Sequence, residues 1–151
     1  MSSGFSAAPT ATARDTGRAM SRENIEVVRR VLDAWEQGDG SRVIEGLDPA
    51  VELVTDPGWP EQGIISGPEE VLRFLEDYRE AFESRATTVE KVVDGRDRVV
   101  VRVVDTVTGR ASGVPTENAF SVAYTLRRGK IARIEYFWDH TEALHAAGLR
   151  E

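Results

Sequence analysis

Hydrophobic and polar residues alternate along three consecutive stretches of the chain, 97–107, 116–127 and 130–139. A period of two, together with many β-branched and aromatic residues, is typical of half-buried strands. The sequence Arg127-Arg128-Gly129-Lys130 predicts a tight hairpin between the last two strands, because glycine adopts positive φ without steric cost. The three stretches therefore predict an antiparallel meander. The residues expected on one common face are Val99, Val101, Val103, Asp105, Phe120, Val122, Tyr124, Leu126, Ile134, Tyr136 and Trp138.

Apolar residues recur at helical spacing in the segments before the meander. Helices are expected at 21–37, at 41–47 with Ser41 as N-cap, and from Pro68 to about Ser84. Short strands are expected at 51–55, 63–66 and 87–93, and a last short helix at 141–147. This order predicts an α+β fold, in which a strongly curved antiparallel sheet carries three N-terminal helices on its concave face.

Composition narrows the possible partners and chemistry. The formal net charge of −7 disfavours binding to nucleic acid or to an anionic membrane, and no apolar run approaches the roughly 18 residues of a membrane helix. The chain has no cysteine, which excludes disulfides and thiolate chemistry and is compatible with a cytoplasmic location. His140 and His145 are five residues apart, off the spacing that places two imidazoles on one helical face, and we predict neither a metal site nor a cofactor.

The chain is expected to contain one folded domain. Residues 1–20 are rich in small and polar residues without periodicity, so they are predicted to form a disordered tail, and Met20 is an alternative start. Residues 21–149 are predicted to form the domain.

Several short sequences carry a resemblance to a known family. They are Ser21 to Arg30, Trp35-Glu36-Gln37-Gly38-Asp39, Leu47-Asp48-Pro49, Ser66-Gly67, Arg127-Arg128-Gly129-Lys130 and Phe137-Trp138-Asp139 through Glu142-Ala143-Leu144 to Gly148-Leu149. Over residues 21–149 the chain resembles the SnoaL-like branch of the nuclear transport factor two-like superfamily. The resemblance implies a cone-shaped α+β barrel around a cavity. It implies a shape more strongly than a reaction, because this superfamily holds isomerases, cyclases, hydrolases, dehydratases and binding proteins.

The resemblance also implies which residues line the cavity. Most of them are apolar or aromatic, as in small-molecule pockets, so the expected partner is a small lipophilic molecule. The candidate ligand-binding residues are Trp35, Trp59, Tyr78, Phe82, Val122, Tyr124, Ile134 and Trp138.

Asp56 is the first candidate for catalysis, since its position resembles that of the catalytic base in steroid isomerase members. Burial in an apolar cone would suit it to proton abstraction beside a carbonyl. Asp-Pro-Gly is also strong turn chemistry, and we favour a turn on that local evidence. The positions of the two oxyanion partners in those isomerases correspond here to Val31 and Val122, which argues against their form of the reaction.

Asp105 resembles one aspartate of the limonene epoxide hydrolase members, whose other two acid-base groups correspond here to Val103 and Tyr136. Alternatively it is a strand end exposed to water, which we favour because charged residues are rarely buried. Tyr136 and Tyr124 lie on neighbouring predicted strands and could donate hydrogen bonds to one ligand oxygen.

Three functions stay open from the sequence. The first is a cofactor-free isomerase or cyclase with Asp56 as base and with Asp105 and Tyr136 assisting. The second is a ligand-binding protein without turnover. The third is an interaction module that forms a homodimer through the outer sheet face, where Ser121, Ala123 and Thr125 are small.

Overall fold

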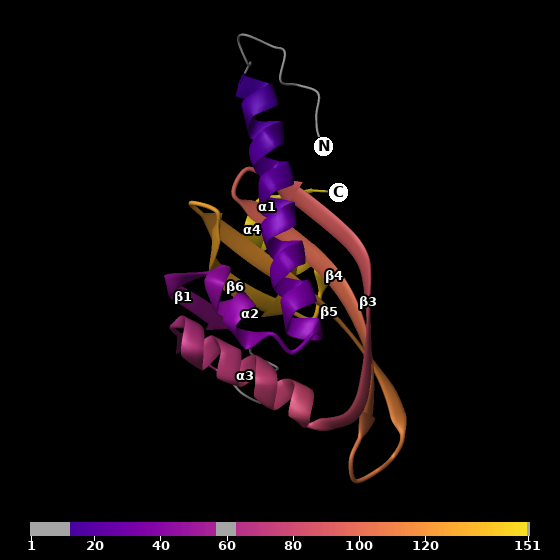
Figure 1. The fold of residues 1–151 in the computed structure, drawn as a ribbon. Coiled ribbons are helices and arrows are strands. Elements are labelled where there is room, and N and C mark those ends of the chain that lie inside the picture. Colours follow the sequence, from indigo (N-terminus) through magenta and orange to yellow (C-terminus); the bar gives the residue numbers. More distant parts are fainter. Residues whose placement is uncertain (1–12, 57–62, 151) are drawn as a thin grey trace.

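The computed structural model describes residues 13–56 and 63–150 of the chain, in which four helices pack against one sheet (Figure 1). The helices are α1 (Ala13–Glu36), α2 (Gly40–Glu45), α3 (Pro68–Glu80) and α4 (His140–Ala147). The strands are β1 (Leu47–Val54), β2 (Ile64–Ser66), β3 (Phe82–Gly95), β4 (Arg98–Gly109), β5 (Pro115–Arg127) and β6 (Lys130–Phe137).

The six strands form one curved sheet in the order β2-β1-β6-β5-β4-β3. The predicted α+β fold with a curved sheet and covering helices is confirmed, but the sheet is not antiparallel throughout. Strand β1 runs parallel to β6, with Leu53 beside Ile134, while the other pairs are antiparallel. A parallel pair joins strands far apart in sequence and leaves no local turn signal, so the pattern could not reveal it.

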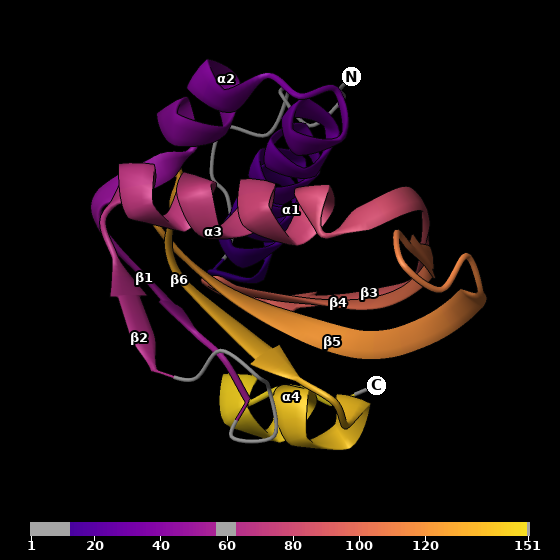
Figure 2. The ribbon, with the colours of Figure 1, turned by 90° about the horizontal axis from the view of Figure 1, so that it is seen from below.

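The sheet separates two layers of helix (Figure 2). Helices α1, α2 and α3 lie on the concave side, as predicted, and α4 lies on the convex side. The alternation along β4 and β5 decides which side each residue faces: Val101 and Val122 face the first three helices, whereas Val100 and Ala123 pack against α4.

Helix α4 changes the picture of the outer face. Ser121 and Ala123, predicted to form a dimer surface, are 0% and 2% exposed in the single chain because α4 covers them. These two residues therefore pack inside the protomer, which corrects the predicted surface. Dimer formation itself stays a prediction.

Two helix boundaries differ from the expected ones. Helix α1 begins at Ala13, so the predicted tail overlaps it over residues 13–20, and residues 1–12 lie outside the described residues. This stretch carries no apolar periodicity, and extension of an existing helix needs only one further backbone hydrogen bond per residue. At α2 the N-cap is Asp39, whose carboxylate accepts the Arg42 backbone N–H, while Ser41 lies inside the helix.

The boundary between α3 and β3 matters most for function. Helix α3 ends at Glu80 instead of Ser84, and β3 starts at Phe82 instead of Thr87. The helical spacing of apolar residues continues to Phe82, but Phe82 pairs with Gly109 of β4 instead. Pairing with a distant strand overrides the local pattern. The strand gains five residues, Arg85 among them.

Candidate functional site

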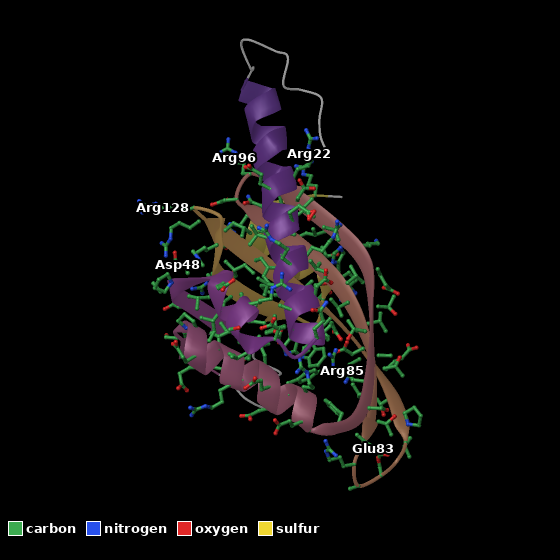
Figure 3. All side chains as sticks on the ribbon, in the orientation of Figure 1. Arg22, Asp48, Glu83, Arg85, Arg96 and Arg128 are labelled. Atoms are coloured by element: carbon green, nitrogen blue, oxygen red, sulfur yellow. The ribbon has the colours of Figure 1, made fainter. Side chains whose placement is uncertain are left out.

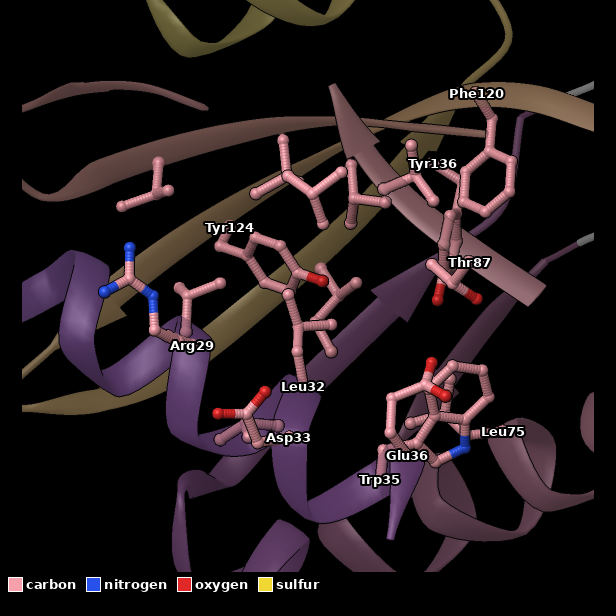
Figure 4. A pocket seen from close by; sticks show the side chains of 18 of the residues that line it. Arg29, Leu32, Asp33, Trp35, Glu36, Leu75, Thr87, Phe120, Tyr124 and Tyr136 are labelled. Carbon is pink, nitrogen blue, oxygen red and sulfur yellow. The ribbon is translucent and has the colours of Figure 1, made fainter. Parts of the chain in front are cut away.

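The concave side of the sheet encloses a cavity of about 520 Å³ beneath α1 and α3 (Figure 4). Valine side chains of β4 and β5 and aromatic rings of α1, α3, β5 and β6 form most of its wall. The strands supply them because alternate residues of a curved sheet converge on its concave side. Residues on the wall include Trp35, Phe74, Tyr78, Val101, Val103, Asp105, Phe120, Val122, Tyr124, Ile134 and Tyr136.

The cavity opens between α1 and β3. Its exposed lining residues come from these two elements: Arg29, Asp33 and Glu36 on the helix, and Thr87, Val89 and Val92 on the strand. Val89 and Val92 are 46% and 43% exposed although both are apolar. These exposed valines make part of the cavity entrance apolar, which suits the entry of a molecule with an apolar surface.

The carboxylate of Asp105 lies on the cavity wall and is 1% exposed. The expectation of a solvent-exposed strand end is therefore wrong. Its Oδ2 accepts a hydrogen bond from the Tyr78 hydroxyl at 2.8 Å, and its Oδ1 accepts one from the Thr87 hydroxyl at 2.7 Å. A buried carboxylate is tolerated only with such partners, because it has lost its hydration. These donors come from α3 and β3, which the fold brings to the end of β4.

Arg85 supplies the countercharge, and sequence reasoning missed it. Its Nη1 lies 3.4 Å from Asp105 Oδ1 and also contacts the Thr87 hydroxyl, and its Nη2 donates to Glu36 Oε2 at 3.0 Å. The guanidinium is stacked over Trp35, with Cζ 4.1 Å from the ring centroid. Figure 3 shows Arg85 where the C-terminal end of α1 approaches β3. Had the strand been extended upstream, its period of two would have placed Arg85, Thr87 and Val89 on one face.

All three tyrosines of the chain lie on the cavity wall. Burial and then the negative charge of Asp105 raise the pKa of Tyr78 and of Tyr136. Burial, followed by the nearby Tyr136, raises the pKa of Tyr124. The three phenols therefore stay protonated at neutral pH and can donate hydrogen bonds.

The rings of Tyr136 and its neighbours form the aromatic part of the wall at the Asp105 end. The Tyr136 ring centroid lies 5.9 Å from that of Phe120 and 6.5 Å from that of Phe74. Trp35 and Tyr78 are also 6.5 Å apart. Centroids at this spacing are typical of favourable aromatic pairs, so the wall is held in place by its own packing.

Among the described residues, three of the predicted site residues do not line the cavity. Asp56 accepts a hydrogen bond from the Trp138 backbone N–H at 3.4 Å and does not line the cavity. Trp138 itself follows the last residue of β6 and is 40% exposed, because the alternation does not continue beyond the strand. Phe82 does not line the cavity and packs edge-on against Tyr78, at 5.3 Å between ring centroids. Trp59 lies outside the described residues.

The described part of the chain contains neither a cluster of potential metal ligands nor a membrane-spanning helix. No group of three or more His, Cys, Asp or Glu side chains in residues 13–56 and 63–150 is arranged to hold a metal ion. None of the helices in these ranges is long and apolar enough to cross a membrane.

A curved sheet with N-terminal helices on its concave side and a cavity beneath them is the fold of solved nuclear transport factor two-like proteins, two of which match this chain with a TM-score of 0.69. Within this class, the chain belongs to the SnoaL-like domain family, whose model matches residues 28–134.

Solved structures share this fold. TerC, co-crystallised with polyporic acid, is 26% identical over 82% of this chain and 96% of its own, with a TM-score of 0.69. A protein from Jannaschia sp. CCS1, provisionally named a SnoaL-like polyketide cyclase, is 21% identical over 86% of this chain and 90% of its own (TM-score 0.71).

A protein with a ketosteroid isomerase-like fold from Catenulispora acidiphila, in complex with trimethylamine, is 15% identical over 83% of this chain and 94% of its own (TM-score 0.65). A search of curated proteins found no match.

Proposed function

We propose that the protein binds a small, largely apolar, ring-bearing molecule in the cavity and performs cofactor-free acid-base chemistry on it, as an isomerase or cyclase. The observation that carries this proposal is the buried Asp105 carboxylate on the wall of an otherwise apolar cavity. A core without a ligand gains nothing from an acid at this position, whereas a proton transfer needs one.

The size and lining of the cavity support the choice of ligand. Small-molecule sites commonly measure about 300–1,000 Å³ and combine apolar walls with a few polar groups, and the volume here is about 520 Å³. Valines and aromatic rings would hold the ring system. The protonated phenols of Tyr78, Tyr124 and Tyr136 favour an oxygen-bearing molecule over a pure hydrocarbon.

The proposed chemistry is a proton shift beside a carbonyl. A carboxylate accepts about four hydrogen bonds, and among the described contacts Oδ2 of Asp105 accepts only that of Tyr78. This oxygen can remove a proton from the carbon next to the carbonyl, while Tyr136 donates a hydrogen bond to the carbonyl oxygen as it becomes an enolate. Return of the same proton to another carbon completes an isomerisation and regenerates the carboxylate. Arg85 holds the carboxylate in place.

The comparisons are consistent with a small-molecule ligand. TerC was co-crystallised with polyporic acid, and the Catenulispora protein with trimethylamine. We therefore transfer to this chain the general role of holding a small molecule.

A second candidate function is binding without turnover. It is favoured by the contacts of Asp105 with Tyr78, Thr87 and Arg85, because a carboxylate with three partners is well suited to a fixed structural role. It is also favoured by Asp56, the predicted base, which does not line the cavity.

The experiment that separates these functions is a turnover assay with β,γ-unsaturated ketones of one to three fused rings, followed by the absorbance of the conjugated product. We expect turnover by the wild type and a loss of about 100-fold or more in Asp105→Asn, the usual scale for a positioned acid or base. Calorimetric binding of the same ketones is measured in parallel. Binding without turnover would establish the second candidate, and unchanged turnover in Asp105→Asn would exclude Asp105 as the base. Neither binding nor turnover would contradict both.

A further inference from the structure

The hydroxyl of Tyr124 is a polar group that the proposed chemistry does not use. The residue is 6% exposed, its side chain lines the cavity, and Figure 4 shows the hydroxyl directed into the space between α1 and the sheet. Within the described residues this hydroxyl has no hydrogen-bond partner. The hydroxyl can therefore be reached from the cavity, and a ligand that offers it a hydrogen-bond partner there would use a donor that the protein leaves unpaired.

This hydroxyl lies apart from the Asp105 end of the cavity. Tyr124 pairs with Val99 of β4, which is six residues, or about 20 Å along the strand, from Asp105. Tyr136 packs its ring on Phe120, and Phe120 pairs with Val103, two residues from Asp105.

The electrostatic contributions separate Tyr124 from Asp105, although not from Tyr136. The charge of Asp105 contributes to the raised pKa of Tyr78 and Tyr136, whereas the causes for Tyr124 are burial and Tyr136. The expectation that Tyr124 and Tyr136 donate to one ligand oxygen stays a prediction, because the two residues are diagonal neighbours on β5 and β6, with Tyr124 beside Ile134 and Val122 beside Tyr136. The two polar positions that lie far apart are those of Tyr124 and Asp105.

We propose that the ligand is an elongated ring-bearing molecule with two oxygen functions at opposite ends, one held at Asp105 and Tyr78 and the other by the Tyr124 hydroxyl. This inference rests on the proposed function, because it names the class of molecule that the same cavity takes. The second oxygen can be a carbonyl or a hydroxyl, since a protonated phenol donates to the first and exchanges hydrogen bonds with the second.

The test uses two rigid probes that differ by one hydroxyl, biphenyl-4,4′-diol and biphenyl-4-ol, with dissociation constants measured by calorimetry. The wild type should bind the diol about three- to tenfold more tightly, as expected for one net hydrogen bond. In Tyr124→Phe this advantage should disappear. In the matched variant Tyr78→Phe, which removes the phenol at the Asp105 end, the diol should keep its advantage while both probes bind more weakly. The one-ring pair hydroquinone and phenol should show no such difference, because one ring is too short to reach both positions.

Thermal unfolding of Tyr124→Phe provides the control for folding. Because its hydroxyl has no partner in the described structure, its removal should leave the Tm unchanged or raise it. A Tm lowered by several degrees would show that the hydroxyl supports the fold instead of a ligand and would overturn the inference. An equal affinity of the wild type for the two biphenyls, or an undiminished preference for the diol in Tyr124→Phe, would also overturn it. If neither biphenyl binds to the wild type, the proposed function fails and the inference fails with it.

Discussion

The two faces of the sheet use the same strands in opposite ways. On the convex face, Val100 and Ala123 pack closely against Ala143 and Leu144 of α4, and the small residues let the helix approach the sheet. On the concave face, the alternate residues of β4 and β5 stop short of α1 and α3 and leave a cavity. The same alternation along the strands thus forms a closely packed interface on one face and a cavity on the other. Which of the two forms depends on the helices that cover each face.

The buried polar groups differ in the same way. Ser121 on the convex face is neutral, and its hydroxyl lies 3.2 Å from Arg102 Nη1 and 2.8 Å from His140 Nδ1. Asp105 on the concave face is an acid that faces the cavity, with Arg85 beside it. Hydrogen bonds to a neutral hydroxyl are enough to fix a helix on a sheet, whereas a buried carboxylate is retained at a considerable free-energy penalty. The comparison therefore locates function on the concave face.

Removal of Arg85 should have the largest effect. In Arg85→Ala the buried Asp105 carboxylate loses its cation and Trp35 loses a stacked partner. The free energy of unfolding should fall by about 3–5 kcal/mol, the range for breaking a buried pair. Chemical denaturation measures this value.

Glu36→Gln is the matched control, because Glu36 also bonds Arg85 but its side chain is 45% exposed. It should cost less than about 1 kcal/mol. Equal losses in the two variants would mean that the Asp105 pair is no more protected from water than a surface pair.

Neighbouring residues on β5 allow the filled and the hollow face to be compared directly. Ala123→Leu adds volume under α4, where the site is already filled, and should destabilise the protein by about 1–3 kcal/mol. Val122→Leu adds volume on the cavity side and should change the stability by less than about 1 kcal/mol, since there is space to receive it. Thermal or urea unfolding of both variants checks this order, and a reversed order would argue that the cavity is closed in solution.

The smallest effect at neutral pH, and a clear one in alkali, is expected from the tyrosines. All three lie in the cavity and have a raised pKa, so the native state keeps their protons while the unfolded state loses them above about pH 10. Because the unfolded state then binds fewer protons, stability should be unaffected below this pH and fall as pH rises above it. Tyrosinate absorbance near 295 nm should appear together with unfolding. Normal titration of all three phenols in the folded protein would contradict their burial.

The sequence allowed the inward faces of β4, β5 and β6 to be predicted, because Val101, Val122 and Ile134 sit in strictly alternating strands that need no distant information. It did not allow the environment of Asp105 to be predicted. The groups that surround this acid come from α1, α3 and β3, and periodicity along one strand carries no record of its neighbours. Arg85 was missed for a second reason, since the helical spacing that ends at Phe82 masked the start of β3.

The predictions that came from the family resemblance also differ in outcome: the fold was predicted correctly, whereas the position of one catalytic candidate was not. The predicted fold is confirmed over the described residues. It could be predicted because the fold of a family depends on many apolar positions, each of which tolerates several residue types. Asp56 does not line the cavity and instead accepts a hydrogen bond from the Trp138 backbone N–H. The position of a single side chain depends on the local path of the backbone, which a family resemblance does not specify. The acid on the cavity wall is Asp105.

The most direct test of the account is a crystal structure of the protein soaked with biphenyl-4,4′-diol. We expect the probe between α1 and strands β4 and β5, with one hydroxyl within hydrogen-bond distance of Asp105 or Tyr136. A cavity closed by its own aromatic rings, or a probe bound only on the outer surface, would contradict the claim that the concave face is a ligand site.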